Sequence, residues 1–205
     1  MDTILTLVRH GQTEANLSGL WQGATDGLLT ARGQAQARQV ADYLARLEAE
    51  VAALYTSPLR RAHDTATAIG QALGLPPQLE PDLAEYNLGD WEGQTFEALR
   101  DTFRLWERTR QDPDFAPPGG ESPRQVVTRI VAALRRIAAA HPGRRVVVVS
   151  HGGALSLGLA LLVGNDPLAW ADYRLDNCAV SELVLSPRPH LLTFNETSHL
   201  DGVGG

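Results

Sequence analysis

Two runs of apolar, largely β-branched residues constrain the fold of this chain more than any other feature: Ile4 to Val8 and Val146 to Val149. Apolar side chains fill nearly every position of both runs, whereas a strand with one wet face alternates apolar and polar residues. A strand of this kind needs both faces buried, as they are in the middle of a parallel sheet covered by helices. We therefore expect both runs to be central parallel strands.

Segments with helical spacing alternate with these strands. Arg32 to Glu50 is expected to be a helix capped by Thr30, because its apolar residues recur every three or four positions. Leu54 to Thr56 is a short strand candidate, and the pair Ser57-Pro58 after it is typical of a helix N-terminus. That helix is expected to end at Gly74. Further helices are expected over Phe96 to Arg110, Val126 to Ala140 and Ala154 to Val163.

The order strand, helix, strand, helix predicts an α/β fold, a three-layer sandwich in which helices flank a mostly parallel sheet. The length of 205 residues suits one domain, and no repeat or long proline- and glycine-rich linker divides it. We expect a single domain over residues 1–205. Its one cysteine, Cys178, cannot form an internal disulfide or supply a cysteine-based zinc site.

Composition excludes several classes of function. The chain has 24 acidic and 18 basic residues and a net charge of −6, which argues against nucleic acid as a partner. All 18 basic residues are arginine, so a Walker-type phosphate loop, a Schiff-base enzyme and a lysine general base are excluded. Because no signal-like leader and no run of about 18 apolar residues is found, we expect no membrane association and a cytoplasmic protein.

Both expected central strands end in the same way, in the pairs His10-Gly11 and His151-Gly152. Ligands of parallel sheets bind at the carboxyl ends of the strands, so both imidazoles are expected at one rim of the sheet. Arg9 lies at the same strand end, and the helix expected after Ser57 would bring Arg60 and Arg61 to that rim. Arginine matches phosphate oxygens and a neutral imidazole is a nucleophile, so this set suits phosphoryl transfer without a metal.

Other interpretations of these residues remain open. A single histidine at a strand end is more often a hydrogen-bonded structural residue, although two such ends favour function. A metal bound by His10 and His151 is possible, but no acidic or histidine ligand follows at metal-ligand spacing, and we expect no metal or cofactor. The histidines without this context are expected to be surface or packing residues: His63, His141, His190 and His199.

Phosphoryl transfer to a histidine also needs a general acid that protonates the departing oxygen. The best candidate segment is Leu83 to Gly93, which contains three carboxylates, Glu85, Asp90 and Glu92. The pattern alone does not choose among them.

Four blocks of this sequence resemble the histidine phosphatase superfamily, in its phosphoglycerate-mutase-like branch. They are Leu7 to Asn16, Thr56 to Ala62, Glu85 to Gly93 and Ser150 to Gly152, and they occur in the family's order across nearly the whole chain. The resemblance implies one catalytic domain with a mixed, mostly parallel sheet, and an edge strand supplied by Ser181 to Leu185.

The resemblance also implies a role for each residue that matches a family motif. His10 would be the nucleophile that forms a phosphohistidine, with Arg9, Arg61 and His151 holding the phosphoryl oxygens and Glu85 as the proton donor. Arg61 is favoured over the arginine before it because the family's arginine directly precedes an alanine. The residues implied on the substrate side are Asn16, Gln22, Gly23 and Glu92.

Within this branch the resemblance favours a phosphomonoesterase acting on a small phosphorylated metabolite. The chain lacks the longer insertion of the mutases, carries Gln22 where they usually have threonine, and resembles phosphatase members over Pro118 to Ser122. A cofactor-dependent phosphoglycerate mutase is the alternative, and a phosphate-binding module without turnover is a further one. Two departures from the pattern concern the substrate side: Leu28 replaces a usual proline, and no arginine follows Gly153.

Aromatic residues are candidates for the leaving-group side of the site. Because aromatics at helical spacing are more often core, we expect Phe103 and Trp106 to be core residues. The full set of candidates is Trp21, Trp91, Phe103, Trp106 and Phe115.

Overall fold

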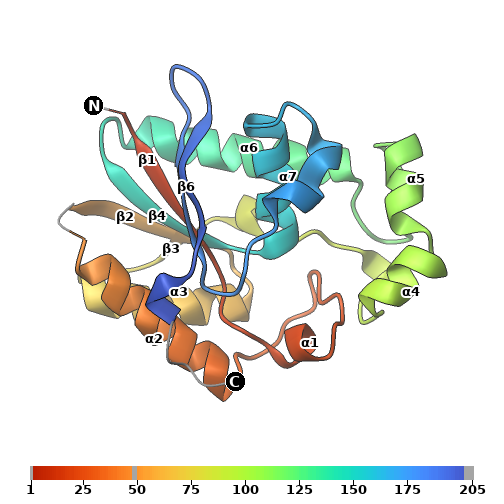
Figure 1. The fold of residues 1–205 in the computed structure, drawn as a ribbon, viewed down its shortest axis with the longest axis horizontal. Coiled ribbons are helices and arrows are strands. Elements are labelled where there is room, and N and C mark those ends of the chain that lie inside the picture. The colour runs from red at the N-terminus through yellow and green to blue at the C-terminus, as the bar shows by residue number, and fades with distance from the viewer. Residues whose placement is uncertain (1, 48–49, 201–205) are drawn as a thin grey trace.

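A computed structural model describes residues 2–47 and 50–200 of the chain (Figure 1). Among these residues, six strands form one mixed sheet in the order β3-β2-β4-β1-β5-β6. The three neighbouring pairs from β3 to β1 are parallel, and β5 and β6 continue the sheet antiparallel. The two apolar runs are the adjacent central strands β1 and β4, as expected. The strands are β1 (Ile4–Arg9), β2 (Val51–Thr56), β3 (Gln78–Leu79), β4 (Arg145–Ser150), β5 (Val180–Val184) and β6 (His190–Glu196).

The prediction of an edge strand over Ser181 to Leu185 was wrong in its place in the sheet. That segment forms β5, which is paired on both sides, with β1 and with β6. The edge is β6, where Leu192 and Phe194 are 50% and 39% exposed. The alternation of buried and exposed residues that marks a strand in sequence is absent from β6, which explains why it was not predicted.

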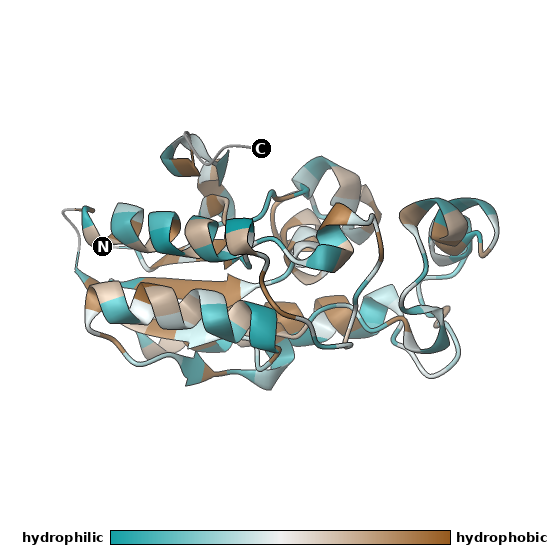
Figure 2. Ribbon diagram, turned by 90° about the horizontal axis from the view of Figure 1, so that it is seen from below, coloured by the Kyte–Doolittle hydropathy of each residue, from teal (hydrophilic) through white to brown (hydrophobic). Residues whose placement is uncertain are grey.

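Four long helices cover the two faces of the sheet, α2 and α3 on one and α6 and α7 on the other (Figure 1). Side chains alternate across β1, so Leu5 and Leu7 pack against α6 and α7 while Val8 packs against α2 and α3. Figure 2 shows the hydrophobic residues gathered on the strands and the hydrophilic ones on the outer turns of the helices. The long helices are α2 (Ala31–Ala45), α3 (Arg60–Leu73), α6 (Pro123–Ala140) and α7 (Gly152–Leu162).

The helix ends confirm some of the expected signals and correct others. Thr30 caps α2 by accepting the backbone N–H of Gly33, and Gly74 ends α3 in the left-handed conformation at φ 67°. The helix expected from Ser57 begins later, at Arg60, because the backbone is still extended at Leu59, which is the N-cap at ψ 133°. Likewise α2 ends at Ala45 instead of Glu50.

The helix expected over Phe96 to Arg110 is in fact two helices. The chain turns between them at Arg104, whose φ of 52° lies in the left-handed region and interrupts a helix. The other two predicted helices each begin a few residues earlier than expected, at Pro123 and Gly152. The short helices are α1 (Glu14–Leu17), α4 (Phe96–Asp101) and α5 (Leu105–Gln111), with 3₁₀ segments η1 (Pro81–Leu83), η2 (Gly89–Trp91), η3 (Pro167–Tyr173) and η4 (Ser198–Leu200).

In the part of the chain that the structure describes, no single helix has the length and hydropathy to cross a bilayer. The pair α7 and η3 reaches that length only when taken together, across a bend of 116°.

Candidate active site

The carboxyl ends of β1 and β4 bring the two strand-end histidines together. The strands are in parallel register with Arg9 opposite Ser150, so the residues that follow, His10 and His151, leave the sheet side by side. Their ring centroids are 5.1 Å apart. The expectation that both imidazoles stand at one rim is confirmed.

His10 is held as a neutral imidazole with one nitrogen free. Its Nδ1 lies 2.7 Å from the Gly11 carbonyl oxygen, which can only accept, so Nδ1 carries the hydrogen and donates. Burial lowers the pKa of His10 well below its ordinary value, and the charges of Arg61 and Arg9 lower it further. Nε2 therefore keeps its lone pair, which is the form a nucleophile requires.

His151 is fixed by a hydroxyl behind it. Its Nε2 lies 2.7 Å from Ser57 Oγ, and that oxygen also accepts the N–H of Leu59 at 3.2 Å. The hydroxyl hydrogen of Ser57 has no other acceptor among the described residues, so its donation to Nε2 leaves neither group unpaired and places the ring hydrogen of His151 on Nδ1. This Nδ1 is buried and has no partner among the described residues. A donor in that position can bind a phosphoryl oxygen beside His10.

Two guanidinium groups flank His10, that of Arg61 buried and that of Arg9 half-buried. Arg9 donates through Nη1 to the Leu175 carbonyl at 2.6 Å. Arg61 donates to the carbonyls of Gly23 at 2.6 Å and Thr25 at 2.9 Å. Burial lowers the pKa of both arginines from its usual value. Each leaves its buried Nε–H without a partner among the described residues, and such a donor is costly unless an anion satisfies it.

Of the three candidate carboxylates, Glu85 lines the cavity beside His10. Its oxygens accept three backbone N–H groups, from Tyr86 at 2.8 Å, Gly153 at 3.0 Å and Ala154 at 2.7 Å. The last two belong to the first turn of α7, so the helix that begins after His151 holds Glu85 at the rim. The structure thus distinguishes Glu85 from Asp90 by position, a choice that the sequence pattern left open.

Glu92 lies outside the cavity wall and binds a loop. Its carboxylate accepts the N–H groups of Ala24 at 2.6 Å and Thr25 at 2.8 Å and the hydroxyl of Thr25 at 2.5 Å. The loop it holds carries the two carbonyls that receive Arg61. The resemblance implied a substrate-side role for Glu92; in the structure its carboxylate holds the loop whose carbonyls receive Arg61.

A cavity of about 430 Å³ opens above these groups, between the rim of the sheet, α4 and η3. Asn16, Gln22 and Gly23 line it, as the sequence predicted, and so does His10, against whose ring the fully buried His151 packs. Ligand pockets in proteins are about 300–1,000 Å³, so this volume suits a small substrate. The lining residues that sequence reasoning did not select are Leu20, Phe96, Glu97, Arg100, Ser156, Trp170, Arg174, Leu175 and Asn177.

The aromatic candidates divide into two groups. Trp21 and Trp106 line the cavity, with ring centroids 5.9 Å apart, so the expectation that Trp106 is a core residue was incomplete. Trp91 packs on Phe103 and Phe115 with centroids 4.7 and 5.9 Å away, outside the cavity wall. The local sequence does not predict which aromatic residues line the cavity, because both groups contain the same residue types at similar spacing.

Residues 2–47 and 50–200 contain no cluster of three or more His, Cys, Asp or Glu side chains that could hold a metal ion. The positive charge in the floor of the cavity comes from the two arginines. The four remaining histidines do not line the cavity. His63 lies on α3, and the other three hydrogen-bond elsewhere: His141 with the Tyr55 hydroxyl, His199 with the Cys178 carbonyl and His190 with the Arg188 carbonyl.

Comparison with known proteins identifies a family that matches nearly the whole chain. The family model described as histidine phosphatase superfamily (branch 1) matches residues 5–197. The uncharacterized phosphatase PhoE of Bacillus subtilis (strain 168) is 34% identical over 201 residues, 98% of each chain. The metal-independent phosphoserine phosphatase of Arabidopsis thaliana is 34% identical over 208 residues, 98% of this chain and 85% of that protein.

Among solved structures, phosphoserine phosphatase from Entamoeba histolytica in complex with 3-phosphoglyceric acid has a TM-score of 0.86. It is 30% identical in sequence, and the match covers 97% of this chain and 99% of that one. The α/β sandwich predicted from the sequence is therefore confirmed both by the strand order and by this likeness.

Proposed function

The chain belongs to branch 1 of the histidine phosphatase superfamily, and we propose that it hydrolyses small phosphomonoesters through a phosphohistidine formed on His10. The family and the phosphatase relatives make it an enzyme that hydrolyses phosphate monoesters. The observation that supports the residue assignment is the free Nε2 of a neutral His10 between two arginines.

In the first step, Nε2 of His10 attacks phosphorus and the bond from phosphorus to the leaving oxygen breaks. The Glu85 carboxyl group gives its proton to that oxygen, so the alcohol departs neutral. The imidazole gains positive charge as the new bond forms, and its Nδ1–H keeps donating to the Gly11 carbonyl. His10 then carries the phosphoryl group.

In the second step, a water molecule attacks the phosphoryl group from the side that the alcohol has left. The Glu85 carboxylate takes the proton of that water while the bond from phosphorus to Nε2 breaks. Inorganic phosphate leaves, and both His10 and Glu85 return to their starting protonation states. The position of Glu85, fixed by backbone N–H groups of α7, supports its use in both steps.

Arg9, Arg61 and His151 hold the phosphoryl oxygens through both steps. Their unpartnered buried donors, Nε of each arginine and Nδ1 of His151, support this role. Two guanidinium charges offset the negative charge that spreads over the phosphoryl oxygens in the transition state, a task that metal ions perform in other phosphoryl-transfer enzymes. The proposed reaction uses no metal or other cofactor.

The substrate side is proposed to take a small phosphorylated metabolite, in keeping with the cavity volume and with the phosphoserine phosphatases among the relatives. Asn16 and Gln22 reach the same cavity, and each also braces the loop around Thr13 by a hydrogen bond of 3.1 Å. A mutase that returns the phosphoryl group to a second hydroxyl is the weaker alternative, because phosphoserine phosphatases recur both among the relatives and among the solved structures.

Rapid-quench labelling tests this proposal. With a ³²P-labelled phosphomonoester, we expect an acid-sensitive label on His10 within the first turnover, followed by free phosphate. The His10→Ala variant should take up no label and release no phosphate. A variant that retained substantial turnover would refute the assignment of the nucleophile. The same labelled ester, incubated with and without a bisphosphorylated primer, distinguishes hydrolysis from mutase activity. Only the formation of an isomerised product by a mutase depends on the primer.

A further inference from the structure

The cavity contains a cation that the proposed reaction does not use, Arg174. It follows η3 and lines the same cavity as Arg9 and Arg61. Among the described residues, no carboxylate lies within ion-pair distance of its guanidinium, and no hydrogen-bond acceptor is placed on it. Several other exposed arginines of the described residues also have no carboxylate partner, among them Arg38 and Arg135, so what distinguishes Arg174 is its place in the cavity wall.

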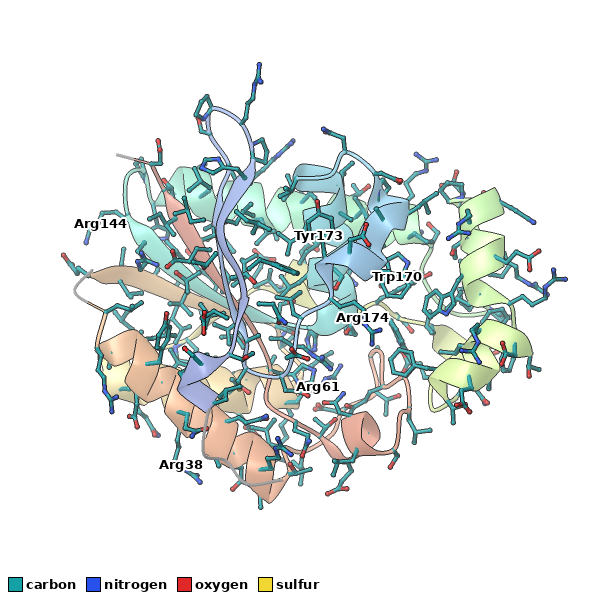
Figure 3. All side chains as sticks on the ribbon, viewed as in Figure 1. Arg38, Arg61, Arg144, Trp170, Tyr173 and Arg174 are labelled. Atoms are coloured by element: carbon teal, nitrogen blue, oxygen red, sulfur yellow. The ribbon has the colours of Figure 1, made fainter. Side chains whose placement is uncertain are left out.

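Arg174 lies close enough to the phosphoryl-binding floor to act on the same small ligand. Burial is the main cause of the lowered pKa of Arg9, and the positive charge of Arg174 acts in the same direction. The next residue, Leu175, supplies the carbonyl that receives Arg9 at 2.6 Å, which ties the two arginines together through the backbone. Figure 3 shows Arg174 between Trp170 and Arg61, on the cavity side of η3.

The part of the cavity wall that α4 forms carries negative charge. On α4, Arg100 is held by both oxygens of Asp101 at 2.7 and 2.8 Å, so its charge is already compensated. Glu97 lines the cavity on the same helix and adds a negative charge. An anionic group on the leaving-group side of a substrate is therefore repelled from α4 and attracted to Arg174.

Aromatic rings form the wall that continues from Arg174. The rings of Trp106 and Trp170 have centroids 4.9 Å apart, and both line the cavity. The only polar group of each ring is the indole N–H, which is an uncharged donor. The polar end of a leaving group is thus directed to Arg174, while its carbon atoms can pack on the rings.

We propose that Arg174 binds a carboxylate on the leaving-group side, so that the substrates are phosphomonoesters of small hydroxy acids. This inference rests on the proposed function, since it needs the phosphoryl group to be held by Arg9 and Arg61. The planar fork of a guanidinium matches a carboxylate by two parallel N–H···O bonds. Arg174 then acts on specificity by choosing and orienting the ester, and it takes no part in the chemistry at phosphorus.

Two esters that differ only in the carboxylate test this inference: O-phosphoserine and O-phosphoethanolamine. The quantity measured is the ratio of their kcat/KM values. We expect the wild type to favour phosphoserine by about 10- to 100-fold, the range of a charged hydrogen-bonded pair. Arg174→Gln should bring the ratio close to one, and Arg174→Lys, which keeps the charge but loses the fork, should restore part of it.

Arg38 is the matched control, because it is an exposed arginine on α2 that does not line the cavity (Figure 3). Arg38→Gln should leave the ratio and both kcat/KM values as in the wild type. A wild-type ratio near one, or an Arg174→Gln variant that keeps the wild-type ratio, would overturn the inference.

Release of phosphate from 4-nitrophenyl phosphate by the wild type distinguishes a failure of the proposed phosphatase function from a failure of the proposed role of Arg174. If that ester, whose leaving group has no carboxylate, is hydrolysed while the ratio stays near one, the proposed function stands and the role of Arg174 fails. If the wild type releases no phosphate from it or from either amino ester, the proposed function fails, and the inference fails with it.

Discussion

The hydroxyl of Ser57 lies 2.7 Å from Nε2 of His151, where the ends of β2 and β4 meet inside the protein. Both residues are fully buried; the hydroxyl oxygen accepts the N–H of Leu59, and its hydrogen has no acceptor other than Nε2 among the described residues. A side chain outside the cavity thereby decides which nitrogen of His151 carries the hydrogen. Ser57 is a positioning residue for a group that the proposed mechanism needs as a donor.

Removal of that hydroxyl is expected to slow the reaction. In Ser57→Ala, His151 is free to place its hydrogen on either nitrogen, and the phosphoryl oxygen loses a fixed donor. We expect kcat to fall about 10- to 100-fold, the cost of one lost buried hydrogen bond. Nitrogen-15 NMR of the imidazole should show a mixture of tautomers where the wild type shows one.

Ser181→Ala is the control for this measurement, since Ser181 is also buried and hydrogen-bonded but lies on β5, away from the cavity. It should change stability while leaving the His151 spectrum and kcat unaltered. A Ser57→Ala variant with the wild-type tautomer and kcat would show that the hydroxyl has no positioning role.

Glu85→Gln is expected to affect esters according to their leaving groups. An amide cannot supply the proton that an alkoxide needs, so kcat for an alkyl phosphate should fall about 10²- to 10⁴-fold. The loss with 4-nitrophenyl phosphate should be much smaller, because nitrophenolate leaves without a proton. Steady-state rates on both esters give the comparison, and Asp90→Asn is the control, since Asp90 does not line the cavity. Equal losses on both esters would exclude Glu85 as the acid.

The pKa of His10 sets the direction of a pH effect. Burial first, and then the charges of Arg61 and Arg9, lower this pKa well below the ordinary value of 6.5. We expect NMR titration to show His10 neutral as the pH falls through 6.5, where the same residue in the urea-unfolded chain becomes protonated. In Arg61→Gln one of the two neighbouring charges is gone, so the titration should move to higher pH.

The same shift has a consequence for stability. The folded pKa lies below the unfolded one, so the unfolded chain binds more protons in the interval between them. The contribution of His10 to the free energy of unfolding is fully present above the unfolded pKa and is lost as the pH falls toward the folded one. His10→Gln should therefore show a weaker loss of stability on acidification from neutral pH than the wild type, measured by urea unfolding. An equal loss in both proteins would contradict the lowered pKa.

Much of the site could be predicted because it lies at strand ends. A buried parallel strand leaves a strong apolar signal, and the residue after it must stand at the rim, so His10 and His151 could be placed from sequence alone. The family resemblance then singled out Arg61 and Glu85, which the pattern had left among alternatives. In the structure both side chains line the cavity.

Other features have no local signal. Arg174 lies in an irregular segment without helical or strand periodicity. Because all basic residues of the chain are arginine, the choice of arginine over lysine does not mark Arg174 as a binding residue. Glu92 binds a loop that lies more than 60 residues away in sequence. A hydrogen bond between two distant segments leaves no recognisable pattern in the sequence of either segment. The break at Arg104 depends on a backbone conformation that helical spacing does not report.

Glu92 is expected to act on catalysis through Arg61. In Glu92→Ala the loop at Ala24 and Thr25 loses its acceptor, and with it the fixed carbonyls that orient the Arg61 guanidinium. Misplacement of such a group by about 1 Å can cost about 10²-fold, and we expect kcat/KM to fall by about that factor. Glu92→Gln keeps one oxygen acceptor and should lose less. Glu14→Ala, an exposed glutamate on α1, is the control. If Glu92→Ala has wild-type kcat/KM, the loop does not depend on this carboxylate.

Gly33 is the point where α2 approaches the loop that follows His10. A Cβ at this position would lie 2.1 Å from the backbone oxygen of Gln12, and that oxygen also accepts the N–H of Thr30. Backbone cannot swing aside as a side chain can, so Gly33→Ala must push α2 and the loop apart. We expect a loss of about 1–3 kcal/mol in the free energy of unfolding, measured by urea, together with a lower kcat, because His10 lies two residues from the displaced oxygen. Gln34→Ala, at the exposed neighbouring position of the same helix, should stay within about 0.5 kcal/mol of the wild type. Wild-type stability of Gly33→Ala would mean that the two segments have room to separate, and that the position of His10 does not depend on their contact.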